Sequence, residues 1–313
     1  MNNLDNNQIA ILELLKASLF GIKPVFTDDT VWDAVLAEAN EQTIVALTAK
    51  AVPEEYASQW WHYTLQSQAQ FVRVMYGQTQ LVNMFELAGI PLVILKGMAA
   101  ATYYPEPFRR TMGDVDFLVP QGRFSEAVQL MSEHGYRQLE QSTLRHIGFM
   151  KEGIEYELHH HFSYADMDIE DEITNGLLHP VWGKISECRF PMLPRLSNGI
   201  VLLTHLRTHM KSGVGLRQMI DWMMYVDKEL DDEFWQSEFS QVAESKGMAK
   251  LAISATRMCQ RYLGLSTRIT WCASADDILC DQLLSLLFSS GNFGRKASNT
   301  VESVSMLILN SRV

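Results

Sequence analysis

Two carboxylates stand two residues apart where an apolar run begins, in Gly113-Asp114-Val115-Asp116-Phe117-Leu118-Val119. Such a short apolar run predicts a buried strand. Successive strand side chains point to opposite faces of a sheet, so Asp114 and Asp116 project from the same face. Adjacent carboxylates repel, and a divalent cation such as Mg²⁺, which prefers oxygen ligands, relieves the repulsion. The spacing therefore predicts a metal site, and changing either Asp to Asn should leave the metal-free protein equally or more stable.

A third carboxylate lies on a predicted β-hairpin over residues 145–160. The second half of this hairpin contains Glu155 and Glu157. Because these two residues are two apart, they share one face of a strand. Either side chain can therefore complete a set of three oxygen ligands with the Asp pair.

The histidines of the chain give weaker signals of a metal site. His159, His160 and His161 are consecutive, and since strand residues alternate between faces, the three cannot all point at one ion. His205 and His209 fit one helix face, but the segment between them lacks the glutamate of the zinc-protease motif HExxH. We interpret these histidines as structural or substrate-contacting residues rather than zinc ligands.

The segment before the Asp pair has features of a phosphate site. Residues 92–95 form a short β-branched run that predicts a buried strand ending at Lys96-Gly97. Residues 98–101 then predict the start of a helix, whose first N–H groups can hold a phosphate. Lys96 and Arg110 border the predicted metal site. They are either ordinary surface charges or phosphate ligands, Lys as a compact charge and Arg as a bidentate donor.

In this order the residues resemble the nucleotidyltransferases of the DNA-polymerase-β superfamily. They are most similar to a bacterial group of largely uncharacterised members with the pattern LKG, YP, R, GDxDxLV and ELH. The matching elements are Leu95-Lys96-Gly97, Tyr104-Pro105, Arg110, Gly113 to Val119 and Glu157-Leu158-His159. The resemblance covers roughly residues 91–160. It departs from the superfamily at Lys96-Gly97, where a Gly-Ser pair is usual, so a serine hydroxyl is not available for phosphate binding.

The resemblance implies an enzyme that moves an NMP from an NTP to an unidentified acceptor and releases pyrophosphate. It implies Asp114, Asp116 and Glu157 as catalytic residues and as ligands of two Mg²⁺ or Mn²⁺ ions, and it favours Glu157 over Glu155. Lys96, Gly97, Arg110 and Gly113 would hold the nucleotide, with Lys96 and Arg110 on the β- and γ-phosphates. The alternatives are an inactive nucleotide-binding or interaction module of the same fold, and a metal-dependent phosphohydrolase.

The periodicity of the chain predicts an α+β protein. A small mixed-sheet nucleotidyltransferase palm at residues 89–175 is expected between an N-terminal helical region, residues 1–88, and a C-terminal helical region, residues 176–313. Helical spacing is clearest over residues 7–20, 54–88 and 123–134, and from about residue 175 onward the pattern predicts helices again.

Composition limits the partners and the compartment. The 313 residues have a formal net charge of −11, which disfavours a long nucleic acid as a partner. No signal peptide and no apolar run of membrane-spanning length is present, so a cytoplasmic protein without a membrane partner is expected. Between Lys184 and Arg217 six basic residues face one acidic residue. This stretch is either a solvated helix face or part of a pocket for the acceptor, a small molecule or a protein.

Overall fold

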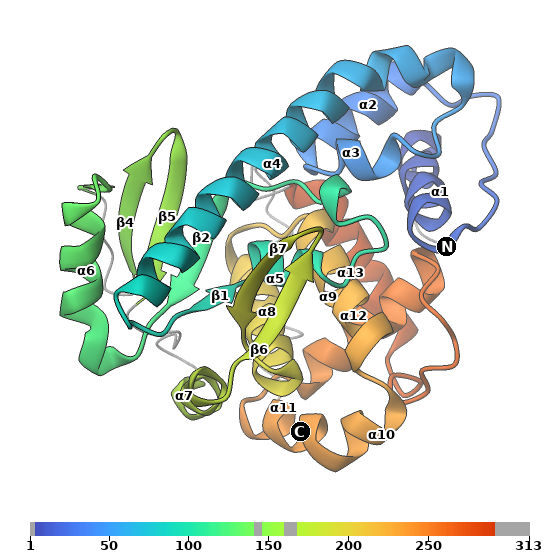
Figure 1. Ribbon diagram of the computed structural model, residues 1–313. Helices are drawn as coiled ribbons and strands as arrows, with labels where there is room; N and C mark the ends of the chain where they lie inside the picture. Colours follow the sequence, from blue (N-terminus) through green and yellow to red (C-terminus); the bar gives the residue numbers. More distant parts are fainter. Residues whose placement is uncertain (1–3, 141–145, 160–167, 292–313) are drawn as a thin grey trace. The chain divides into compact units, whose positions relative to one another are not determined.

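The computed structural model describes residues 4–140, 146–159 and 168–291, with the side chains of residues 211 and 212 left out. The chain divides into two compact units, each assembled from separate segments (Figure 1). The helical unit comprises Met1–Gln68, Tyr103–Thr111 and Leu202–Val313, and the sheet unit comprises Ala69–Thr102 and Met112–Val201. The expected division into residues 1–88, 89–175 and 176–313 stays a prediction. Each unit contains segments that are far apart in the sequence.

The sheet unit contains a seven-stranded mixed sheet within the described residues, in the order β3-β4-β5-β2-β1-β7-β6. Its strands are β1 (Val93–Leu95), β2 (Asp114–Leu118), β3 (Arg137–Gln138), β4 (His146–Lys151), β5 (Ile154–His159), β6 (Val181–Ile185) and β7 (Cys188–Met192). The helices that belong wholly to this unit are α5 (Gly97–Ala101), η3 (Gln121–Arg123), α6 (Phe124–Glu133) and α7 (Glu170–Leu178). The α+β fold class predicted from the sequence is confirmed.

The chain passes from one unit to the other within two long helices, α4 (Ala57–Leu87) and α8 (Arg195–Ser212). The other helices of the helical unit are α1 (Asn6–Phe20), α2 (Trp32–Glu41), α3 (Val45–Thr48), η1 (Glu54–Tyr56), η2 (Pro107–Arg109), α9 (Leu216–Glu229), α10 (Asp232–Phe234), the π-helical turn η4 (Trp235–Phe239), α11 (Ser240–Ser245), α12 (Ala249–Tyr262) and α13 (Asp277–Ser290). The core of this unit is aromatic, with Trp222, Tyr225 and Phe239 fully buried.

Strand pairing fixes which side chains share a face of the sheet. Strand β2 pairs antiparallel with β1 and parallel with β5. Because side chains alternate along β2, Val115 and Phe117 project from one face and the Asp pair from the other. The apolar face packs against the part of α4 within the sheet unit, where the rings of Phe85 and Phe117 lie 5.6 Å apart edge to face. The carboxylates therefore project from the face opposite that contact.

The turn of the β4–β5 hairpin follows from its sequence. The loop residues Glu152 and Gly153 both have positive φ, +51° and +74°. Positive φ at both central residues is the requirement of a type I′ turn, whose twist matches that of the flanking strands. The turn sets the register in which Ile147 pairs with Leu158. The hairpin predicted over residues 145–160 is present over 146–159, and residues 145 and 160 lie outside the described ranges.

The prediction that the chain is helical from about residue 175 is wrong for residues 181–192. These residues form the β6–β7 hairpin, and β7 pairs with β1 at Ile94 and Met192. Alternate residues of the hairpin, among them Gly183, Ile185 and Phe190, are buried. A period of two is the strand signal. Here it was missed because the buried set includes a glycine, which carries no apolar side chain.

Within the described residues, no helix combines the length and the apolar character that crossing a membrane requires.

Candidate functional site

The pairing of β2 with β5 brings a carboxylate from each strand to the same place. Asp116 lies directly opposite Glu157 in the register, and Asp114 lies opposite Glu155. Paired residues on neighbouring strands point to the same face, so all four carboxylates project from the face opposite the α4 contact. The predicted proximity of Asp116 and Glu157 is thus explained by one parallel strand pair.

A compact cluster forms around Asp116 from residues of these two strands. His159, two residues beyond Glu157 on β5, places its Nε2 atom 2.9 Å from Asp116 Oδ1 and 3.5 Å from Glu157 Oε2. The potential ligand atoms of Asp116, Glu157 and His159 all lie within 4.8 Å of one another. Two carboxylates and an imidazole that converge in this way fit a divalent cation. Mg²⁺ prefers oxygen ligands, whereas first-row transition metals also accept imidazole.

The electrostatics of the cluster favour an ionised Asp116. Asp116 is 4% exposed, and burial alone would raise its pKa, but Lys96 and His159 hold it well below its usual range. Burial likewise opposes charge on His159, yet its hydrogen bonds to Asp116 and Glu157 raise its pKa. Glu155 differs, because burial and the charge of Glu157 raise its pKa. Asp116 is therefore the anionic centre of the site.

Lys96 reaches into the same cluster from the end of β1. Its ammonium lies 2.7 Å from Asp116 Oδ1. The backbone at Lys96 has φ +45° and ψ −126°, where α5 begins. A non-glycine residue in such a conformation costs about 1–3 kcal/mol and is retained where the surrounding structure requires it. The strained backbone and the ion pair together fix the ammonium beside Asp116.

The two predicted glycines have different surroundings. A Cβ atom added at Gly97 would lie 3.1 Å from Met112 Cε and 3.8 Å from the carbonyl oxygen of Asp114. At Gly113 an added Cβ would meet nothing within 4 Å. Gly97 thus allows α5 to begin close to β2. At position 113 a larger side chain would have room, so packing does not explain the glycine there. A nucleotide-binding role for either residue stays a prediction.

Arg110 belongs to the helical unit, where it makes a buried ion pair. Its Nε and Nη2 atoms donate to the two oxygens of Asp221 in α9, each at 2.7 Å, and Arg110 is 4% exposed. The Tyr104 hydroxyl donates to the same carboxylate at 2.7 Å. Burial and the charge of Asp221 raise the pKa of Tyr104. Two motif residues thus anchor the segment 103–111 to α9, and a phosphate-binding role for Arg110 stays a prediction.

His146 is a neighbour of the cluster that sequence reasoning missed. It lies opposite His159 in the β4–β5 register, and its Nε2 atom is 3.7 Å from Glu157 Oε1. His159 was considered from the sequence but was not assigned to the metal. Its spacing of two from Glu157 was the available signal, because it places both side chains on one face.

Four other histidines were considered as metal ligands in the sequence. His160 and His161 lie outside the described ranges. His205 and His209 share a face of α8, as their spacing predicts, with their Nε2 atoms 2.9 Å apart.

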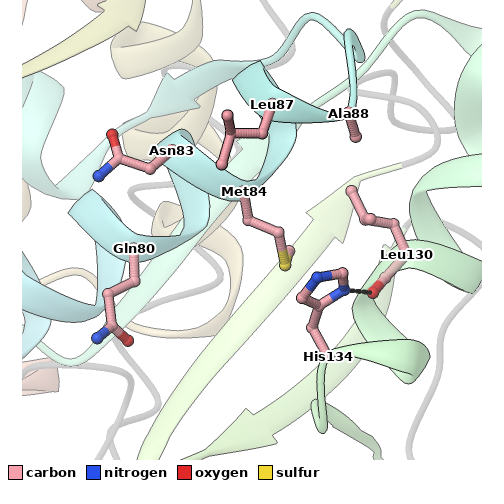
Figure 2. A pocket seen from close by; sticks show the side chains of 7 residues that line it. All are labelled: Gln80, Asn83, Met84, Leu87, Ala88, Leu130 and His134. Atoms are coloured by element: carbon pink, nitrogen blue, oxygen red, sulfur yellow. Dashed lines mark hydrogen bonds between the residues drawn. The ribbon is translucent and has the colours of Figure 1, made fainter.

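A groove between α4 and α6 is separate from this cluster (Figure 2). Its volume is about 500 Å³. The lining residues are Gln80, Asn83, Met84, Leu87, Ala88, Leu130 and His134. None of them is a predicted site residue, and the ring of His134 is hydrogen-bonded through Nδ1 to the carbonyl oxygen of Leu130 at 2.9 Å.

Comparison with known proteins gives a family and a distant structural similarity. A family described as "Uncharacterised nucleotidyltransferase" matches residues 28–264. No curated protein matches the chain. Among solved structures, the chain is similar to an antigenic nucleotidyltransferase-like protein from Paracoccidioides brasiliensis, with 13% identity and a TM-score of 0.40, over 63% of this chain and 96% of that chain. A similarity of this degree transfers no structural detail to the present chain.

Proposed function

This chain belongs to the uncharacterised nucleotidyltransferase family, which it matches over residues 28–264, and we propose that it transfers an NMP from an NTP to an acceptor and releases pyrophosphate. The observation that carries the proposal is the convergence of Asp116, Glu157 and His159, whose ligand atoms lie within 4.8 Å of one another. The cluster lies on two paired strands, β2 and β5. Rigid strands hold a site more closely to one geometry than loops do.

The proposed reaction is a displacement at the α-phosphorus. An acceptor oxygen forms a bond to this phosphorus while the bond to the oxygen bridging the α- and β-phosphates breaks. The acceptor loses a proton, and the leaving group departs as pyrophosphate. A bound divalent cation supplies a Lewis acid that lowers the pKa of the acceptor and neutralises charge on the leaving oxygens.

The residues of the chain have separate roles in this proposal. Asp116 and Glu157 would supply carboxylate ligands. The His159 Nε2 atom, which contacts Asp116 Oδ1 at 2.9 Å, would exchange this contact for the ion when it ligates. Asp114 extends the anionic face from which Asp116 projects and is the further candidate ligand. Lys96 brings a positive charge to the same place, which favours the approach of an anionic triphosphate.

The proposal is tested by labelling an acceptor. The protein is incubated with each of the four α-labelled NTPs, Mg²⁺ or Mn²⁺ and a cell extract, and the macromolecular and small-molecule fractions are separated. We expect one nucleotide to label one class of acceptor with the wild-type protein and not with Asp116→Asn. Equal labelling by both proteins would contradict the assignment of the site. Release of free nucleotide without a labelled acceptor would instead identify a phosphohydrolase.

A further inference from the structure

Strand β6 forms one edge of the sheet, and its outer side is not paired with any strand that the structure describes. Opposed residues of an antiparallel pair alternate between those that exchange both backbone hydrogen bonds and those that exchange none. Pro191 of β7 has no N–H, so its partner in the register, Trp182, belongs to the second kind. Two residues further along β6, Lys184 belongs to it as well. The N–H and C=O groups of Trp182 and Lys184 therefore point to the outer edge of the sheet.

The side chains of these two residues share one face of the β6–β7 hairpin with a second cation. Trp182 and Lys184 are exposed, and so is Arg189, which lies opposite Lys184 in the register. The Arg189 guanidinium lies 5.3 Å from the centre of the Trp182 ring. Glu187 in the turn lies 3.7 Å from the Lys184 ammonium but is 94% exposed, so water screens this pair. The edge surface, which we define as Trp182, Lys184 and Arg189, thus directs two positive charges to solvent beside an aromatic ring.

The edge surface lies on the same side of the sheet as the carboxylate cluster. Met192 of β7 pairs with Ile94 of β1, which pairs with Phe117 of β2, so these three side chains share the face that contacts α4. Arg189 is an odd number of residues from Met192 and therefore projects from the other face. That face is the one from which Asp116 projects. A ligand on the edge surface is thus on the side of the sheet where the proposed reaction takes place.

We propose that the β6 edge binds the acceptor of the reaction as an extended, acidic peptide segment that adds a strand to the sheet. The inference rests on the proposed function, since it names the class of acceptor and selects a protein over a small molecule. In strand addition, backbone hydrogen bonds supply affinity and alternate side chains supply specificity. Acidic side chains on every second residue of the peptide would face Lys184 and Arg189, and this charge complementarity distinguishes an acidic segment from a basic one.

A second copy of this chain is the less favourable occupant of the edge. Paired β6 strands would bring two Lys184 and two Arg189 side chains onto one face, where like charges repel. Lysine on an edge strand is also a common protection against pairing between copies. The same cations attract an acidic segment. The net charge of the chain, −11, acts weakly at the edge, because salt screens exposed charges beyond about 8 Å.

The position of the edge limits where the acceptor group lies in such a peptide. In the strand order, a strand added to β6 would be four spacings from β2, or about 19 Å away. An extended chain advances about 3.3 Å per residue. The acceptor group is therefore expected at least about six residues from the docked strand.

The test measures peptide binding by fluorescence anisotropy, without nucleotide or metal. The probe is a short labelled peptide in which glutamate alternates with valine, and the comparison peptide has lysine in place of glutamate. We expect the wild type to bind the glutamate peptide about tenfold more tightly, and Lys184→Glu combined with Arg189→Glu to reverse the preference. Lys228→Glu is the matched control and should bind as the wild type does, because Lys228 is exposed to a similar extent as Lys184, 51% against 56%.

Hydrogen exchange tests whether the bound peptide adds a strand. The amide protons of Trp182 and Lys184 should exchange more slowly in the complex, because they point to the outer edge. Those of Gly183 and Ile185 point to β7 and should be unchanged. A glutamate peptide methylated at alternate backbone nitrogens cannot donate to the edge, and we expect it to bind about tenfold more weakly.

Each other result overturns the inference. It fails if neither peptide binds, if both bind equally, or if binding leaves the amide protons of Trp182 and Lys184 unprotected. A wild-type dimer that excludes the peptide would identify a second copy as the occupant. Labelling of a small molecule by the wild type and not by Asp116→Asn would support the proposed function and overturn this inference alone. Peptide binding by a protein that labels no acceptor would contradict the proposed function and, with it, the acceptor role of the peptide.

Discussion

At the scale of single residues, Asp116 combines burial, charge and two close partners. The sequence alone predicts that replacing it relieves repulsion with Asp114. The structure adds the ammonium of Lys96 at 2.7 Å and the ring of His159 at 2.9 Å. Removing one member of a buried ion pair leaves the other charge unpaired. The expected sign of the stability change is therefore reversed for this residue.

We expect Asp116→Asn to lower the free energy of unfolding of the metal-free protein by about 3–5 kcal/mol, because the largely buried Lys96 ammonium loses its closest anion. Urea denaturation with a chelator present measures the change. Asp114→Asn is the control, since Asp114 is only half-buried, and its loss should be smaller. Equal stability of Asp116→Asn and the wild type would show that the ion pair with Lys96 contributes nothing.

His159 gives the metal-free protein a pH dependence. Its pKa is raised from 6.5 in the folded state, so protonated His159 stabilises the fold. This contribution is complete below about pH 6.5 and is lost as the pH rises through the folded pKa. We therefore expect the free energy of unfolding to fall as the pH rises through this range. The fall should be steeper in the wild type than in His159→Asn. Replacing the exposed His62 by Asn is the control and should leave the pH slope of the wild type unchanged. If His159→Asn kept the wild-type slope, the pH dependence would not come from His159.

Sequence reasoning predicted that Asp114 and Asp116 share a face because strand alternation is a local rule. Asp116 and Glu157 follow from spacing and from the ordered motifs, and the structure brings them together through one register. The partners of Lys96 and Arg110 could not be found in this way. The Arg110 to Asp221 ion pair joins residues 111 positions apart, and no local pattern encodes such a pairing.

At the scale of elements, the contact of α4 with β5 depends on a glycine. A Cβ atom at Gly77 would lie 2.3 Å from the Tyr156 hydroxyl oxygen and 2.7 Å from Ile154 Cδ1. These distances are far below van der Waals contact, so the helix can approach the strand closely only with glycine there. The hydrophobic pattern of residues 54–88 correctly predicted the long helix but contained no information about this close approach.

We expect Gly77→Ala to destabilise the protein by about 1–3 kcal/mol through overpacking. Alanine in a helix interior brings a gain of about 1 kcal/mol, which offsets only part of the overpacking cost. Gly122→Ala is the matched control, because an added Cβ there meets nothing within 4 Å. Thermal unfolding of the two variants measures the difference. A Gly77→Ala protein as stable as the control would mean that α4 and β5 are packed less closely than described.

Helices of the chain were predicted more successfully than strands. Residues 7–20 and 123–134 were predicted as helices, and the structure has α1 at Asn6–Phe20 and α6 at Phe124–Glu133. Long periodic segments repeat their signal several times. The strands β6 and β7 have five residues each, and Pro191 lies within β7. A proline argues against a strand in a sequence reading, so Pro191 in β7 adds to the effect of the buried glycine in β6 in hiding this hairpin.

At the scale of the whole molecule, the segment 103–111 ties the middle of the chain to α9. Arg110→Ala leaves Asp221 buried without its cation, and we expect a loss of about 3–5 kcal/mol in the free energy of unfolding. Arg109→Ala is the matched control, because Arg109 pairs with the more exposed Glu106, and such pairs contribute about 1 kcal/mol or less. Chemical denaturation compares the two variants. Equal losses would contradict a structural role for the Arg110 to Asp221 pair.

The most direct measurement of the central claim follows the α- and γ-phosphates of one NTP separately. The wild-type protein should place α-label on an acceptor and release γ-label as pyrophosphate, and Glu157→Gln should do neither. Glu155→Gln, the neighbour that lies opposite Asp114 rather than Asp116, should retain both activities. Release of γ-label as orthophosphate, or undiminished transfer by Glu157→Gln, would contradict nucleotidyl transfer at this cluster.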